Sequence, residues 1–329
     1  MKVLITGSSG HLGEAIVRKL RETSYVPVGV DIKPSEFTTH VGSITDRDFV
    51  METLKGVDFI IHTATLHKPH VATHTYQDFV DTNITGTLNL LEVAAANRAK
   101  AFIYTSTTST FGDSLTPPPG ELAVWVTEQT PSIPKNIYGV TKEAAENLVQ
   151  LFSRNHQLPG VVLKTSRFFP EEDDKKEMRD AYEDANLRVT ELLYRRVDLE
   201  DAVSAHLQAI ERAEQIGFGK YIISATSPFQ PQHLTMLHAD AASVVRQLYP
   251  DFEDIFSQKS WKMVPQIDRV YVNKKARLEL GWQPKYDFRY ALDCLKRDED
   301  FRSPLARTVG IKGYHPQKFI DGPYPVTNH

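Results

Sequence analysis

The sequence predicts an α/β fold built on a doubly wound parallel sheet. Short apolar runs alternate with segments of helical periodicity as far as about residue 167, and the first two runs are joined by a glycine-rich turn. The pattern changes after Pro170, where strand candidates become sparse. We therefore expect a Rossmann-type domain at 1–167, with parts of 197–227 and 268–275 returning to it. A smaller α+β substrate-binding region is expected mainly at 168–300.

The first unit reads as strand, turn, helix and strand. Its turn carries glycines at 7, 10 and 13, and its second strand ends at Asp31. A side chain at Gly7 or Gly10 would hold the backbone away from a pyrophosphate, and Gly13 allows the helix to pack on its strand. The Asp31 carboxylate can accept both ribose hydroxyls of an adenosine. The unit predicts dinucleotide binding, and a glycine-rich turn without a ligand is the alternative.

Bulk properties exclude several classes of function. The 329 residues carry a net charge of −4, which offers no basic surface for nucleic acid or lipid. No apolar run approaches the length of a membrane span, and the N-terminus runs directly into the first strand, leaving no room for a signal peptide. The single cysteine, Cys294, fits a reducing compartment. A cytoplasmic enzyme with a small-molecule substrate is expected.

Later segments follow the same alternation before it fades. Helices are expected at 46–54, 79–97 and 138–152, strands at 57–64, 101–106 and 161–164, and an irregular loop at 115–134. The charged stretch 171–184 is expected to be a solvated helix or loop. Beyond it, a strand is expected at 221–224, and helices at 234–248, 273–280 and 288–296. The tail at 301–329 is expected to pack on the body or on a partner subunit.

Four histidines lie between residues 62 and 74. These histidines could bind a metal or belong to a polar loop beside a ligand pocket. The polar loop is favoured because the cysteines or carboxylates of usual metal sites are missing. No metal is expected.

Tyr138 and Lys142 lie four residues apart on a predicted helix, so their side chains share one face. An ammonium beside a phenol lowers the phenol pKa, which would make Tyr138 a general acid or base. Thr107 follows the preceding strand, at the sheet edge where ligands bind, and could hydrogen-bond the same substrate oxygen. A surface helix pair is the alternative for Tyr138 and Lys142.

Several motifs of this sequence together resemble those of a known protein family. The glycine turn at 7–13, Asp31, the stretch 83–87 (Asn-Ile-Thr-Gly-Thr), the Tyr138–Lys142 pair and the turn at 280–284 (Leu-Gly-Trp-Gln-Pro) occur in one chain. The chain resembles the extended short-chain dehydrogenase/reductases, the NAD-dependent epimerase/dehydratase family, over most of residues 1–290.

The resemblance implies a cofactor, a catalytic group and an assembly. NAD is implied over NADP, although Lys33 could tolerate the NADP phosphate. A homodimer through a four-helix interface, made by 79–97 and 138–152 of each subunit, is also implied. The implied catalytic residues are Thr107, Tyr138 and Lys142, and the implied cofactor residues are Gly7, Ser9, Gly10, His11, Leu12, Gly13, Asp31, Ile32, Ser43, Ile44, Thr63, Ala64, Asn83, Thr105, Tyr138, Lys142 and Phe168.

Departures from the family pattern bear on the reaction. Thr107 is followed by Thr108 and Ser109 rather than the Asp-Glu of the family's dehydratases, and Pro170 replaces the Asn that holds nucleotide-sugars. The short stretch after Phe169 also disfavours a large UDP-sugar. We expect an NAD(P)-dependent oxidoreductase acting on a hydroxyl or carbonyl carbon of a sugar, sugar acid or similar molecule. An NAD-retaining UDP-sugar epimerase and a catalytically silent, redox-sensing NAD-binding scaffold are the alternatives.

Overall fold

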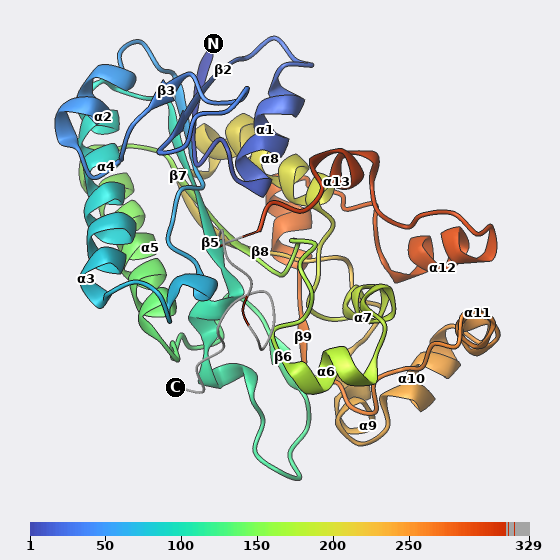
Figure 1. Ribbon diagram of the computed structural model, residues 1–329. Helices are drawn as coiled ribbons and strands as arrows, with labels where there is room; N and C mark the ends of the chain where they lie inside the picture. The colour runs from blue at the N-terminus through green and yellow to red at the C-terminus, as the bar shows by residue number, and fades with distance from the viewer. Residues whose placement is uncertain (314, 316–318, 320–329) are drawn as a thin grey trace.

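The structure, a computed structural model, describes residues 1–313, 315 and 319 (Figure 1). Its centre is a seven-stranded, fully parallel sheet with strand order β3-β2-β1-β4-β5-β7-β8. The chain starts in the middle of this sheet and winds outward in both directions, which confirms the predicted fold class. The strands are β1 (Lys2–Thr6), β2 (Val26–Asp31), β3 (His40–Val41), β4 (Phe59–His62), β5 (Ala101–Thr107), β7 (Gly160–Thr165) and β8 (Phe218–Ile223).

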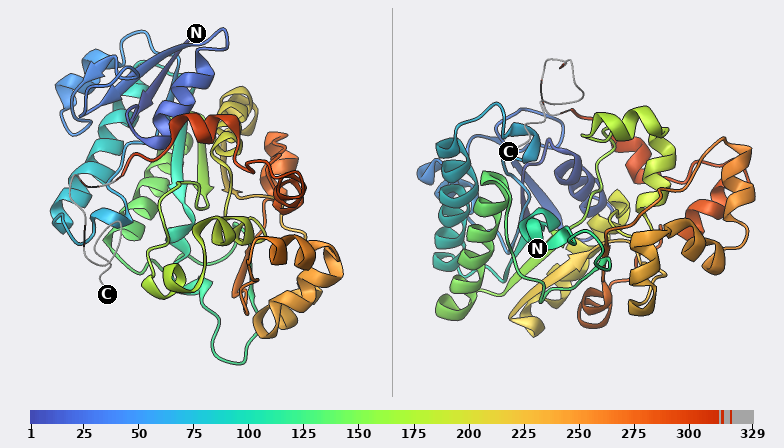
Figure 2. Two further views of the ribbon diagram at one scale, coloured as in Figure 1. Left: turned by 45° about the vertical axis from the view of Figure 1, so that its right-hand side comes forward. Right: turned by 90° about the horizontal axis from the view of Figure 1, so that it is seen from below.

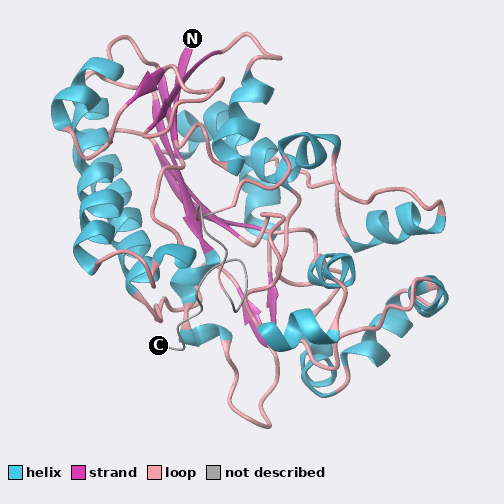
Figure 3. Cartoon of the chain, in the orientation of Figure 1, coloured by secondary structure: helices cyan, strands magenta, loops and turns pink. Residues whose placement is uncertain are grey.

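Helices cover both faces of this sheet (Figure 3). Val3 and Ile5 of β1 pack on one face against α1 (His11–Leu20), α8 (Leu199–Ile216) and α13 (Pro304–Val309). Leu4, which points the opposite way, packs on the other face. That second face is covered by α2 (Arg47–Thr53), α4 (Gly86–Ala96) and α5 (Ile137–His156). Both faces are buried, so the strands read as continuous apolar runs.

A second group of elements lies beside the large sheet and has its own apolar core (Figure 2). Its helices are α6 (Lys176–Ala181), α7 (Asp184–Glu191), α9 (Leu234–Ala239), α10 (Ala241–Leu248), α11 (Phe252–Gln258) and α12 (Phe288–Lys296). Its two parallel strands are β6 (Val124–Val126) and β9 (Arg269–Tyr271). β9 therefore pairs outside the seven-stranded sheet, although Tyr271 shares a small cluster with Ile222 of β8.

Four expected segments differ from prediction. The loop at 115–134 contains β6, whose pairing partner lies more than a hundred residues away and leaves no local signal. The helix at 79–97 is built from α3 (Tyr76–Phe79), a π-helical stretch (Val80–Thr85) and α4. The helix at 234–248 is divided at Asp240, whose side chain caps α10 by accepting the Ser243 N–H at 3.2 Å. The segment at 273–280 is π-helical over Ala276–Leu280.

The C-terminal part first returns to the large sheet layer. Leu305 and Val309 of α13 pack into the cluster that holds α1 and α8. The next residues, 310–313 and 315, are here called the C-terminal segment. The expectation for the tail at 314, 316–318 and 320–329 lies outside the described residues. None of the helices in the described part is long and apolar enough to cross a bilayer.

Candidate active site

A cavity of about 960 Å³ lies at the carboxyl ends of the parallel strands. Residues at or just after the ends of β1, β2, β4, β5 and β7 line it, together with Arg269 and Tyr271 of β9. In doubly wound sheets this is the edge where ligands bind. The second group of elements therefore supplies part of the wall of the same cavity.

The glycine-rich turn closes tightly at one end of the cavity. Gly7 has φ +74°, and its N–H donates to the Val30 carbonyl at 2.8 Å. A Cβ on Gly13 would stand 1.9 Å from the Gly7 carbonyl oxygen, so only glycine lets α1 begin here. The Ser9 N–H donates to the Asp31 carboxylate at 3.0 Å, which fixes that carboxylate beside the turn. A helix N-terminus, a tight turn and a carboxylate fit a dinucleotide's pyrophosphate and ribose.

Thr107, Tyr138 and Lys142 meet deeper in the cavity. Thr107 ends β5, and Tyr138 lies in the first turn of α5, which the Asn136 side chain caps by accepting the Gly139 N–H at 3.1 Å. Thr107 and Tyr138 share a side-chain hydrogen bond. One turn along α5, the Lys142 ammonium donates to the Thr105 carbonyl at 2.7 Å and lies 4.1 Å from the centre of the Tyr104 ring.

Burial sets the ionisation of this group. It raises the pKa of Tyr138 to about 12, although the Thr107 hydrogen bond acts in the opposite direction. It also lowers the pKa of Lys142 to about 7, against the opposing Glu146 carboxylate. The expected lowering of the Tyr138 pKa by Lys142 is therefore wrong for this arrangement, because burial of the phenol raises its pKa. The Lys142 ammonium donates instead to the Thr105 carbonyl. The Tyr138 side chain is a neutral phenol at pH 7.

Glu146, one further turn along α5, was not singled out from the sequence. It is fully buried and accepts hydrogen bonds from Ser106 Oγ at 2.5 Å and from Lys164 Nζ at 2.7 Å. Lys220 Nζ lies 3.1 Å from its other oxygen. The spacing Tyr138, Lys142, Glu146 was the available signal, because three polar residues four apart lie on one helix face.

The histidine-rich stretch divides into two parts. His62 is buried within the sheet, where its ring nitrogens lie 2.7 Å from Thr6 Oγ1 and 2.9 Å from Thr87 Oγ1. His67 lines the cavity, and its ring centre lies 6.1 Å from that of Tyr138. Burial, with the charges of His70, Lys142 and His11, lowers the pKa of His67 to about 3. Within the described residues no group of three or more ligating side chains could hold a metal ion.

All but one of the candidate residues line this cavity. The exception is Asn83, which lies behind the wall. Its side-chain oxygen accepts the Leu66 N–H and the Thr65 hydroxyl, both at 2.8 Å, and its amide donates to Thr141 Oγ1 at 3.0 Å. Asn83 thus joins the cavity-lining residues Thr65 and Leu66 to α5 without lining the cavity itself.

Several charged residues in or beside the cavity were not predicted from the sequence. The stretch 171–184, expected to be solvated, contains Glu171 and Asp173, both only 5% exposed and both ion-paired. Their partners come from distant segments, which the local run of charges does not reveal. The cationic residues of the cavity wall that the sequence did not mark are Lys68, Arg167, Arg195, Arg269 and Lys312.

Fold and cavity together are those of an enzyme that uses a dinucleotide. A model of the NAD dependent epimerase/dehydratase family matches residues 3–223. This match spans well over half of the chain, and the protein therefore belongs to the NAD dependent epimerase/dehydratase family.

Two of three relatives bear the names of nucleotide-sugar enzymes, and the third is named for glycan biosynthesis. UDP-arabinose 4-epimerase 1 of Arabidopsis thaliana is 23% identical over 85% of this chain and 78% of its own length. The dTDP-glucose 4,6-dehydratase of Neisseria gonorrhoeae is 30% identical over 51% of this chain and 56% of its own. The low-salt glycan biosynthesis protein Agl12 of Haloferax volcanii is 28% identical over 54% of this chain and 60% of its own length. The chain thus spans only about half to three fifths of several relatives it matches.

Solved structures share the fold. A short-chain dehydrogenase/reductase superfamily protein from Agrobacterium tumefaciens with bound NAD gives a TM-score of 0.63 at 21% identity, over 91% of this chain and 98% of that one. The UDP-N-acetylglucosamine 4-epimerase from Bacillus cereus gives a TM-score of 0.62 at 18% identity, over 90% of this chain and 97% of that one. At these identities the likeness establishes the fold alone.

Proposed function

We propose that the protein is an NAD-dependent oxidoreductase that transfers hydride at a hydroxyl or carbonyl carbon of a sugar, sugar acid or similar polyhydroxylated molecule. The observation that carries this proposal is the meeting of Thr107, Tyr138 and Lys142 in the cavity that the glycine-rich turn also lines. The proximity of these three side chains also argues against a catalytically silent, redox-sensing scaffold, which would not require them.

The glycine-rich turn and Asp31 would hold the pyrophosphate and the adenosine ribose, with Lys142, Phe168 and the other cavity residues named above contacting the remainder. NAD supplies the hydride acceptor at the carbon that reacts. The neutral Tyr138 phenol would give its proton to a carbonyl oxygen, and the phenolate left by that step would take the proton back from the hydroxyl as the reaction reverses. Thr107 shares a hydrogen bond with Tyr138 and would orient the same oxygen.

Replacing Tyr138 tests this assignment. In Tyr138→Phe the ring and its packing remain but the proton is lost, so we expect turnover to fall about 10²- to 10⁴-fold. NAD affinity, measured by fluorescence titration, should change little, because the hydroxyl serves the reacting oxygen. Tyr290→Phe, which changes a tyrosine that does not line the cavity, is the matched control. Turnover by Tyr138→Phe at the wild-type rate would remove this residue from the chemistry.

An NAD-retaining nucleotide-sugar epimerase is the second candidate. It is favoured by the relatives' names and by the C-terminal segment, which contacts both walls of the cavity. The Lys312 N–H donates to His11 Nε2 at 2.9 Å, and His315 Nε2 lies 2.9 Å from the Pro69 carbonyl oxygen. A cofactor beneath these contacts would exchange slowly, as an epimerase requires. Pro170 and the short region after it still favour the oxidoreductase.

The assembly and location belong to the same proposal. The outer face of α5 exposes Val140 (49%) and Leu151 (36%), which supports a four-helix homodimer formed with α3–α4. Sedimentation as a 37.2 kDa species would exclude it. A cytoplasmic location is supported by the single, buried and unpaired Cys294.

A further inference from the structure

The part of the cavity wall formed by Lys68, Arg167, Arg195 and Arg269, here called the cationic wall, is not used by the proposed chemistry. It lies next to the reacting group. Thr107 pairs with Thr165 in the register of β5 and β7, and Arg167 follows Thr165 by two residues. A substrate held by Thr107 and Tyr138 would therefore extend towards these cations.

Two backbone segments bring the arginines together. The Tyr271 N–H of β9 donates to the Tyr194 carbonyl at 3.0 Å, so the end of β9 lies beside the turn after α7. Arg195 extends from that turn and Arg269 from β9, and both line the cavity. The segments are far apart in sequence, which is why no motif marks the pair.

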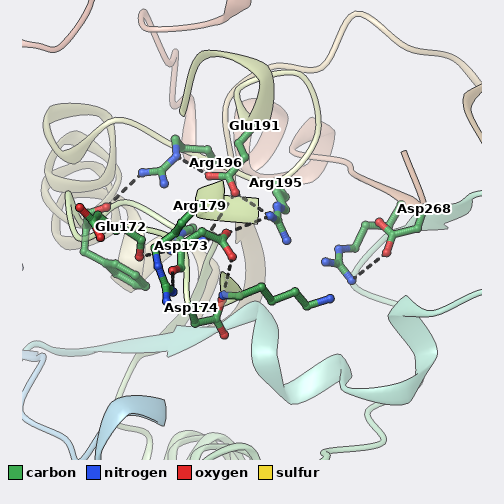
Figure 4. Close-up of polar contacts among 12 residues, drawn as sticks. Glu172, Asp173, Asp174, Arg179, Glu191, Arg195, Arg196 and Asp268 are labelled. Carbon is green, nitrogen blue, oxygen red and sulfur yellow. Dashed lines mark hydrogen bonds and ion pairs between the residues drawn. The ribbon is translucent and has the colours of Figure 1, made fainter. Parts of the chain in front are cut away.

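The buried charges behind this wall do not cancel. Glu191 accepts a hydrogen bond from Arg196 Nε at 2.7 Å and forms an ion pair with Arg195 at 2.7 Å, and Asp173 pairs with Arg167 at 2.6 Å. Figure 4 shows the Glu191 side chain between Arg195 and Arg196. Three guanidinium groups thus face two carboxylates that are 2% and 5% exposed, leaving one positive charge in excess. Burial disfavours the Glu191 carboxylate, but Arg195, Arg196 and Arg167 hold its pKa well below its usual range.

Arg269 is only loosely held. Its guanidinium reaches the Leu115 carbonyl at 3.4 Å and Asp268, which is 41% exposed, at 3.6 Å. Arg269 makes both of these contacts through Nη1, and Arg195 contacts Glu191 and Asp173 through Nη2, so one terminal nitrogen of each guanidinium has no hydrogen-bond partner among the described residues. Each guanidinium carries five N–H donors in a planar fork, which matches the oxygens of a carboxylate or phosphate. The wall therefore has both the charge and the donors for an anion.

We propose that the cationic wall binds an anionic oxygen group of the substrate, a carboxylate or a phosphate, with Arg195 and Arg269 as its main contacts. The proposal rests on the proposed function and narrows its substrate to acidic polyols. The reacting hydroxyl would lie at Thr107 and Tyr138 while the anion is held by the two arginines.

Equilibrium binding to the NAD-loaded protein tests this without requiring turnover. Glucose, glucuronate and glucose 6-phosphate share one ring and differ in the acidic group. We expect glucuronate or glucose 6-phosphate to bind at least about 10-fold more tightly than glucose, because hydrogen bonds to charged groups are the stronger ones. The tighter of the two identifies the source of the anion, and UDP-glucose tests whether a nucleotide diphosphate occupies the wall instead.

Arg269→Gln should remove that preference, lowering affinity for the acidic sugar about 10- to 100-fold and leaving glucose and NAD unaffected. Arg269→Lys should restore part of it. Arg246→Gln, which breaks an exposed pair with Glu253, is the matched control. Equal affinity for all the sugars, or an acidic preference that survives Arg269→Gln, would overturn the inference and leave the arginines a purely structural network.

The two proposals fail in different ways. If the acidic sugar binds through Arg269 but neither NADH nor an altered sugar forms, the proposed reaction is wrong and the anion site stands. If neutral sugars react as well as acidic ones, the reaction stands and the anion site is wrong.

Discussion

Tyr138, the proposed acid or base, is held in a buried environment together with two charged neighbours on α5. Tyr138 is 7% exposed, Lys142 1% and Glu146 0%, and they follow one another at one-turn intervals. The Glu146 carboxylate faces the buried cation Lys164 and the half-buried Lys220, while Lys142 donates to the Thr105 carbonyl. Because burial keeps Tyr138 a neutral phenol, the resting site holds the proton that a carbonyl oxygen would receive, and oxidation of a hydroxyl requires this phenol to lose its proton first.

The depressed pKa of Lys142 makes stability depend on pH. The folded group titrates near 7 and the unfolded one near 10.5, so between these values the unfolded chain binds the extra proton. The free energy of unfolding should therefore rise with pH, by about 2 kcal/mol from pH 7 to 9. Lys142→Met should flatten this rise, apart from a contribution of the same sign from Lys164.

Urea unfolding at both pH values measures this effect. Lys55→Met changes an exposed lysine and should keep the full rise. A wild-type free energy of unfolding that stays level or falls from pH 7 to 9 would show that Lys142 is not buried in this way.

At this scale the sequence was informative where short spacing carries the chemistry. The glycines at 7–13, Asp31 and the Tyr138–Lys142 pair lie within single units, and the structure brings them to one cavity with Thr107. Arg195 and Arg269 could not be found in the same way, because only the contact between β9 and the turn after α7 makes them neighbours. The direction of the Tyr138 pKa shift depends on how deeply the phenol is buried, which no spacing determines.

The element that positions the cofactor end is the turn between β1 and α1. A Cβ on Gly13 would overlap the Gly7 carbonyl oxygen at 1.9 Å, whereas one on Gly10 would stand 3.3 Å from it. Gly13→Ala should therefore lower the free energy of unfolding by about 3 kcal/mol and weaken NAD binding.

Gly10→Ala is the matched control, with a loss of stability below about 1 kcal/mol. Both variants are measured by thermal unfolding. Gly13→Ala would instead gain about 0.5–1 kcal/mol from helix propensity if the turn were open, and that gain would contradict the geometry described here.

Elements were predictable when their signal was periodic and local. The alternation of strands and helices placed most of the large sheet. The alternation did not predict β6 and β9, each three residues long, because their pairing joins segments far apart in the chain. It also did not give the π-helical stretch in 79–97, since apolar spacing alone does not separate one helical winding from another.

On the scale of the whole molecule, three parts meet at one cavity. The large sheet contributes the glycine-rich turn and the group around Tyr138, the second group of elements contributes Arg195 and Arg269, and the C-terminal segment contacts both sides. Gly313 N–H also donates to the buried Glu171 at 3.2 Å. A cofactor and substrate bound in this cavity would therefore contact all three parts.

We propose hydride transfer between NAD and an acidic polyol, and a panel of substrates tests this reaction. The purified protein is incubated with NAD and with sugars, sugar acids, sugar phosphates or UDP-sugars, and NADH and products are measured together. We expect NADH to form in equal amount with an oxidised product, and to form from the acidic substrates in preference to neutral sugars. An epimerised UDP-sugar without net NADH, or no change in any member while NAD still binds, would contradict it.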